Sequence, residues 1–65
     1  MQIELNGQTV ETDAPNVAAL LNERQIDAAC VASAFNGRFL PRSQYENQQL
    51  EAGCRLEVLS PMQGG

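Results

Sequence analysis

Two Asn-Gly dipeptides, Asn6-Gly7 and Asn36-Gly37, constrain the fold of this chain more than any other feature. Both residues of such a dipeptide readily adopt positive φ, which a two-residue β-hairpin turn requires. The runs on either side are short, and either alternate between apolar and polar residues or are rich in apolar and β-branched ones: 1–5, 8–12, 30–35 and 38–40. The sequence therefore predicts two hairpins, each with short strands.

One helix is predicted between the hairpins, from Val17 to Glu23 or Arg24. Val17, Leu20 and Leu21 recur at helical spacing on one face. Asn16 is a suitable N-cap because its side chain can accept a hydrogen bond from a first-turn amide. Two helical turns are marginal in isolation, so we expect this helix to be held by packing on a sheet.

The second half of the chain is expected to end in one more strand. Ser43 is predicted to cap a single helical turn over residues 44–47, and Leu50 is predicted to anchor the following loop in the core. The final stretch, 55–60, alternates again, with Leu56 and Val58 on one face and Leu59 on the other.

The resulting order is strand, strand, helix, strand, strand, strand. This order predicts an α+β domain over residues 1–60 of the ubiquitin-like β-grasp type. A mixed sheet of four to five strands would pack on one short α-helix. The first and last strands can pair in parallel at the sheet centre, because a helix and a long connection separate them. Residues 61–65 are predicted to form a flexible tail.

Charge and composition narrow the functional classes. Eight acidic residues, four arginines and no lysine or histidine give a net charge of −4, which argues against nucleic-acid binding and suits partners with basic grooves. Two cysteines without histidine make a structural zinc site improbable. Cys30, as a small apolar strand residue, and Cys54, as a thiol beside a turn, are expected to be free and at opposite ends of the sheet. With no secretory signal and no membrane span in the sequence, we expect a cytoplasmic protein.

The last five residues, Pro61 to Gly65, suggest a function. The two final glycines have no side chain to pack, and a chain without Cβ atoms can enter a narrow enzyme cleft. Fully extended, five residues reach at most ~17 Å. The folded body therefore looks like a carrier for the Gly65 carboxylate. The sequence contains no acid–base pair and no phosphate-binding loop that would suggest an enzyme.

A family resemblance rests on residues spread over the whole chain. The residues that resemble the family are the stretch 36–43, which reads Asn-Gly-Arg-Phe-Leu-Pro-Arg-Ser, followed by Tyr45, Leu50, Gly53, Leu56-Glu57-Val58, Pro61 and Gly64-Gly65. This combination resembles the ThiS family of small sulfur carriers in thiamine (thiazole) biosynthesis.

The resemblance implies a mechanism and its partners. An adenylyltransferase of the ubiquitin-activating type would use ATP to convert the Gly65 carboxylate to an acyl-adenylate. Sulfur from a cysteine desulfurase or a rhodanese-like relay would displace AMP and leave a thiocarboxylate, which thiazole synthase would receive. The chain itself would bind no cofactor and would act as a co-substrate.

A docking surface is expected beside the tail. Leu59, with Ala32 and Ala34, is predicted to line the sheet face away from the helix, where the activating enzyme would bind. Of the tail, Met62, Gln63 and Gly64 are expected to contact partners.

Three alternatives remain open. The first is the small subunit of molybdopterin synthase, which shares the fold and the Gly-Gly end. The second is a protein modifier that forms isopeptide bonds through activated Gly65. The third is a non-covalent interaction domain whose tail is inert.

Overall fold

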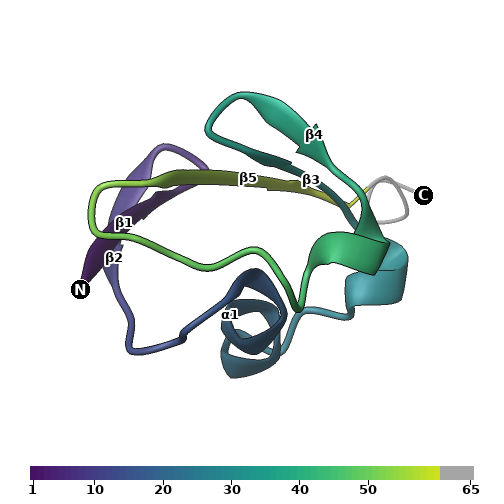
Figure 1. Cartoon of the computed structure of the whole chain (residues 1–65), viewed down its shortest axis with the longest axis horizontal. Helices are drawn as coiled ribbons and strands as arrows, with labels where there is room; N and C mark the ends of the chain where they lie inside the picture. The colour runs from purple at the N-terminus through teal and green to yellow at the C-terminus, as the bar shows by residue number, and fades with distance from the viewer. Residues whose placement is uncertain (61–65) are drawn as a thin grey trace.

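The predicted mixed sheet is present and has five strands. The computed structural model describes residues 1–60; the tail predicted at 61–65 lies outside this range. The strands are β1 (Gln2–Leu5), β2 (Gln8–Glu11), β3 (Ala32–Phe35), β4 (Arg38–Leu40) and β5 (Arg55–Leu59). Their order across the sheet is β2-β1-β5-β3-β4. One α-helix lies across a single face of this sheet (Figure 1), so the α+β class is confirmed.

Both Asn-Gly hairpins form as predicted. Asn6 and Gly7 have φ of 51° and 82°, and Asn36 and Gly37 have φ of 50° and 86°. These left-handed values allow a two-residue turn whose twist matches that of the flanking strands. Each turn therefore connects antiparallel neighbours, β1 with β2 and β3 with β4.

The last strand lies in the middle of the sheet. β5 pairs in parallel with β1, with Leu5 opposite Leu56, and antiparallel with β3, with Ala32 opposite Leu59. β5 alternates as expected: Leu56 is fully buried, whereas Leu59 is exposed. Because the central strand runs to Leu59, the chain after it starts from the middle of one sheet end (Figure 1).

The helix α1 (Val17–Glu23) supplies the other half of the core. Val17, Leu20 and Leu21 are buried as predicted and face the sheet, and Leu50 anchors its loop as expected. The remaining buried apolar side chains come from both layers and the connecting loops: Ile3, Ala14, Leu40, Tyr45, Cys54 and Leu56.

The start of α1 is held by a side chain and by a distant loop. The Asn16 side chain accepts a 2.8 Å hydrogen bond from the Ala19 amide, which confirms the predicted cap. The Ala18 amide donates to the Tyr45 carbonyl at 2.9 Å. Amides of the first helical turn have no partner within the helix, so the loop after β4 stabilises a helix of only seven residues.

The prediction that Cys30 begins a strand is wrong. Residues Ala28–Cys30 form a 3₁₀ helix, η1, and β3 starts two residues after Cys30. The Asp27 side chain accepts from the Ala29 amide at 2.9 Å and so caps this turn. A local cap thus overrides the apolar run that suggested a longer strand.

The helical turn after β4 also differs from the prediction. Residues Arg42–Gln44 form a second 3₁₀ helix, η2, with Pro41 rather than Ser43 at its N-cap and no side-chain cap bond. Proline has a fixed φ, and the Pro41 carbonyl accepts the first hydrogen bond of this helix, from the Gln44 amide at 2.9 Å. The helix therefore begins earlier than the serine suggested.

Candidate functional site

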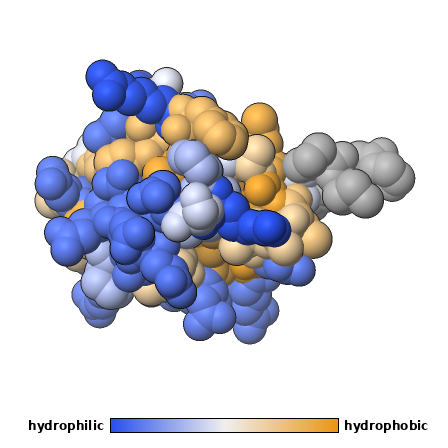
Figure 2. All heavy atoms as spheres, turned by 45° about the vertical axis from the view of Figure 1, so that its right-hand side comes forward, coloured by the Kyte–Doolittle hydropathy of each residue, from blue (hydrophilic) through white to orange (hydrophobic). Residues whose placement is uncertain are grey.

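An apolar groove of about 490 Å³ lies on the sheet face opposite α1. Its lining comes from the turn after β1 and from strands β3, β4 and β5: Asn6, Ala32, Ser33, Ala34, Phe39, Glu57, Val58 and Leu59. Apolar surface gathers at the end of the molecule where β5 ends (Figure 2). The groove thus opens next to the point from which the chain continues toward Gly65.

The residues predicted for this face are where the sequence placed them. Ala32 and Leu59 are opposite one another in the β3–β5 pair, and Ala34 lies two residues along the same strand. Leu59 is 71% exposed. Alternation along a strand sends every second side chain to the same face, and here that face carries no helix. Ala32 and Leu59 are exposed and Ala34 is half-buried, so the predicted face is confirmed, whereas contact of these residues with a partner stays a prediction.

Phe39 is a second large apolar residue of the groove that the sequence analysis did not select. It is 72% exposed and lies opposite Ala34 in the β3–β4 pair. Its neighbour Leu40 is buried. That contrast is the signal that could have identified it, because inward placement of Leu40 forces Phe39 to the open face.

The groove also carries polar groups. Glu57 lies opposite Ala34 in the β3–β5 pair and is exposed. Asn6 contacts β5 from the other side, through two hydrogen bonds with the backbone of Val58. An exposed apolar groove with a carboxylate fits a partner surface that offers apolar side chains beside a basic group.

The other predicted site residues fall outside the described residues. Gly65, Gly64, Gln63 and Met62 all follow Ser60, the last residue that the structure describes. Ser60 comes directly after β5 and lines a smaller groove of about 370 Å³ with Asn6, Val58 and Cys30. The described part of the site is therefore the groove together with the end of β5.

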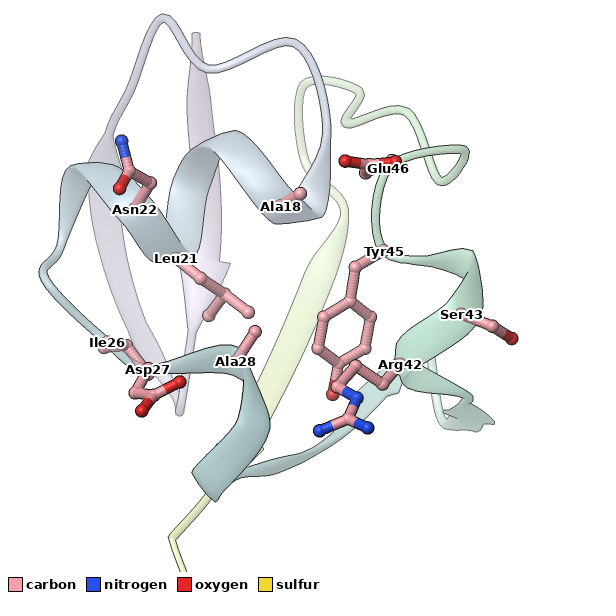
Figure 3. A pocket seen from close by; sticks show the side chains of 10 residues that line it. All are labelled: Ala18, Leu21, Asn22, Ile26, Asp27, Ala28, Arg42, Ser43, Tyr45 and Glu46. Carbon is pink, nitrogen blue, oxygen red and sulfur yellow. The ribbon is translucent and has the colours of Figure 1, made fainter.

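A third groove, of about 480 Å³, lies on the helix side of the molecule. Figure 3 shows Leu21 and Ala28 pointing toward the Tyr45 ring, with the Arg42 side chain beside that ring. The Ser43 hydroxyl points away from the groove (Figure 3). The charged groups of this groove, Asp27, Arg42 and Glu46, have mixed sign. Its polar side chains do not point toward a common position, so this groove offers no comparable site.

One of the two thiols lies in the predicted environment and the other does not. Cys30, expected to be a small apolar strand residue, is exposed, whereas Cys54 directly follows the turn at Gly53, as predicted, and is buried. Both are free, and β3 and β5 run antiparallel from them, so they lie at opposite ends of the sheet as predicted. A hydrogen bond from the Cys30 thiol to Asp27, together with the negative charge of that carboxylate, raises the pKa of Cys30.

Residues 1–60 offer neither a cluster of candidate metal ligands nor a membrane-spanning helix. They contain no group of three or more histidine, cysteine, aspartate or glutamate side chains arranged to hold a metal ion. Within the same range, α1 is the longest helix and is far too short to span a bilayer, and no helix there qualifies.

Comparison with known proteins identifies the family. The ThiS family model matches residues 2–65. A crystal structure of the thiamine biosynthesis protein ThiS from Geobacter metallireducens is 29% identical, with a TM-score of 0.85 and full coverage of both chains. An NMR structure of a thiamine biosynthesis protein from the same organism is 30% identical, with a TM-score of 0.80, and is matched over 88% of its length by this entire chain. Among curated proteins, no match is found.

The family match extends through the sheet, the helix, the groove and the Gly-Gly end. The strand order and the single crossing helix agree with the β-grasp fold of the similar structures. On this evidence the chain belongs to the ThiS family.

Proposed function

We propose that this protein is a sulfur carrier of thiamine biosynthesis. The single observation that carries the proposal is an exposed apolar groove at the end of β5, from which the chain runs into the sequence Pro61 to Gly65. A carrier needs a surface for recognition next to the group that it delivers. The groove fits the first requirement, and a terminal carboxylate on a side-chain-free glycine fits the second.

The proposed chemistry takes place on Gly65 and within partner enzymes. An adenylyltransferase uses ATP to convert the carboxylate to an acyl-adenylate, with release of pyrophosphate. A sulfur donor, either a cysteine desulfurase or a rhodanese-like protein, attacks the acyl-adenylate through its cysteine persulfide and displaces AMP, which gives an acyl disulfide. A second thiol then reduces this S–S bond, so that Gly65 keeps the sulfur as a thiocarboxylate and the donor cysteine ends in a disulfide with that thiol. Thiazole synthase then takes the sulfur. Activation is required because a carboxylate is a poor acyl donor, whereas AMP is a good leaving group.

The body of the protein supplies recognition in this scheme. Leu59, Ala34 and Phe39 contact the activating enzyme, while Met62, Gln63 and Gly64 lie in the channel that leads to its nucleotide. The net charge of −4 favours a partner with a basic groove. We place the protein in the cytoplasm, whose reducing conditions keep thiols such as Cys30 and Cys54 reduced.

The family match and the two thiamine biosynthesis structures support this role over that of a molybdopterin synthase small subunit. Co-purification separates the two: the proposal expects thiazole synthase as the bound enzyme. Recovery of the molybdopterin synthase large subunit in its place would contradict it.

Intact-mass measurement of the protein from its own cell tests the chemistry directly. A fraction of the molecules should be heavier by the difference between one sulfur and one oxygen atom, and fragmentation should place this difference on Gly65. A variant that lacks Gly64 and Gly65 should show no such species and should fail to support growth of a thiamine auxotroph. Rescue by that variant would refute the carrier role.

A further inference from the structure

The end of β5 has an unusual partner on its β1 side. The parallel β1–β5 register covers only Glu4 with Arg55 and Leu5 with Leu56. β1 then ends in the Asn6-Gly7 turn and leaves toward β2. β5 nevertheless continues to Leu59, so no strand from residues 1–60 lies beside its last residues on this flank.

The side chain of Asn6 takes the place of the missing strand. Its Oδ1 accepts a 2.7 Å hydrogen bond from the Val58 amide, and its Nδ2 donates a 3.3 Å bond to the Val58 carbonyl. The backbone amide of Asn6 already donates to the Leu56 carbonyl at 3.0 Å. Asn6 thus extends the hydrogen bonding along β5 to Val58, two residues beyond Leu56, where the β1–β5 pairing ends.

The turn geometry makes this possible. Asn6 has φ of 51° and is followed by Gly7 with φ of 82°. Asparagine tolerates this left-handed conformation better than other residues that have a side chain. Glycine could also adopt this conformation, but glycine has no side-chain amide that could bond to β5. The position therefore combines a turn requirement with a contact to the last strand.

We propose that Asn6 is a positioning residue that fixes the end of β5, and with it the direction in which the chain leaves toward Gly65. The inference rests on the proposed carrier function. On one flank β3 fixes this end of β5, through the pairing of Ala32 with Leu59. On the other flank the side-chain amide of Asn6 fixes it, through its bonds to Val58. A tail that starts from a fixed strand end reaches a partner's active site from a defined direction, which lowers the orientational cost of reaction.

The chain itself offers a matched control. Asn36 occupies the equivalent turn position, with φ of 50°, and its Oδ1 accepts a 2.8 Å bond from the Arg55 amide. Arg55 is the first residue of β5, at the opposite end from Leu59. The variants Asn6→Gly and Asn36→Gly remove the side-chain hydrogen bonds of each turn to β5, two in the first and one in the second, and keep a residue that accepts positive φ.

The first measurement is amide hydrogen exchange of both variants. In Asn6→Gly, the Val58 amide should exchange about tenfold faster or more, while the Arg55 amide keeps its protection. Asn36→Gly should show the reverse. Unchanged exchange at Val58 in Asn6→Gly would overturn the proposal, because β5 would then be fixed without the side chain.

The second measurement is charging of Gly65 in a desalted extract of the source cell supplied with ATP and cysteine, followed by intact mass. Asn6→Gly should be charged about tenfold more slowly or worse, and Asn36→Gly at close to the wild-type rate. Equal rates in the two variants would overturn the positioning role while the carrier function stands. Failure of the wild-type chain to be charged would overturn the carrier function, and the role of Asn6 with it.

Discussion

Tyr45 and Ser33 are joined by a hydrogen bond inside the core, where the tyrosine hydroxyl donates to Ser33 Oγ at 3.0 Å. Both residues are 3% exposed. Ser33 lies in β3, and Tyr45 follows η2, so the bond fastens the loop to the sheet. This loop also supplies the carbonyl that accepts from the Ala18 amide in the first turn of α1. One buried polar pair therefore connects the sheet, the loop and the helix.

Removal of one partner of the Tyr45–Ser33 hydrogen bond should lower the free energy of unfolding more than removal of both partners. Tyr45→Phe leaves the buried Ser33 hydroxyl without its donor, and we expect it to lower the free energy of unfolding by about 1–3 kcal/mol. In the double variant with Ser33→Ala, neither polar group remains buried, so part of the loss should return. Urea denaturation of the two single variants and the double variant measures this coupling. Strict additivity of the two losses would show that the bond contributes nothing.

The Asn16 cap gives a second prediction. Asn16→Ala removes the acceptor of the Ala19 amide, and the free energy of unfolding should fall by about 1 kcal/mol. Asn16→Asp keeps an acceptor oxygen and should retain most of the stability. Denaturant titration compares the three proteins. A loss as large in the aspartate variant as in the alanine variant would show that the cap bond is not the cause.

The reactivity of Cys30 gives a third prediction, which concerns pH. The hydrogen bond to Asp27 and the negative charge of that carboxylate raise the pKa of the thiol, so less thiolate is present at a given pH. Asp27→Asn removes the charge and keeps an oxygen that can cap the Ala29 amide. It should shift the pH profile of iodoacetamide alkylation to lower pH and speed the reaction near neutrality.

Because the thiol holds its proton more tightly in the folded state, this interaction stabilises the fold below the ordinary pKa of an unfolded cysteine thiol. The contribution is lost as pH rises through the higher folded pKa. Cys54 serves as an internal control, since its burial should slow alkylation in both proteins. An identical Cys30 profile with and without the Asp27 charge would contradict the assignment.

The regular elements could be predicted from the sequence because their signals are local. The Asn-Gly dipeptides determine both hairpins, and the spacing of Val17, Leu20 and Leu21 determines the helix. The alternation around Leu56 also placed Leu59 on the open face. Each of these signals depends on residues within one turn or one strand.

The remaining features depend on contacts between distant segments. The hydrogen bonds of the Asn6 side chain with the Val58 backbone join residues separated by 52 positions, and no local pattern indicates them. Phe39 becomes part of the groove only when β4 pairs with β3 in the observed register. The exposure of Cys30 follows from a 3₁₀ turn of three residues, which is too short to produce a periodic pattern.

The groove itself gives the last prediction. Leu59→Arg places a positive charge and a longer side chain where the proposed activating enzyme binds, so the kcat/KM of adenylation should fall about tenfold or more, equivalent to about 1.4 kcal/mol. The side chain is 71% exposed, and the free energy of unfolding should change little. Phe39→Ala should weaken adenylation in the same direction, because it removes the other large apolar side chain of the groove.

Thr9→Arg is the control for added charge. Thr9 is exposed on β2, opposite Glu4, on the same open sheet face but outside the groove. Thr9→Arg introduces the same side chain as Leu59→Arg and changes the net charge by the same amount. Pyrophosphate release by the activating enzyme, measured with each variant at equal folded concentration, should separate Thr9→Arg, close to wild type, from the two groove variants. If all three variants are activated equally well, the groove is not the docking surface, and recognition depends on the residues after β5.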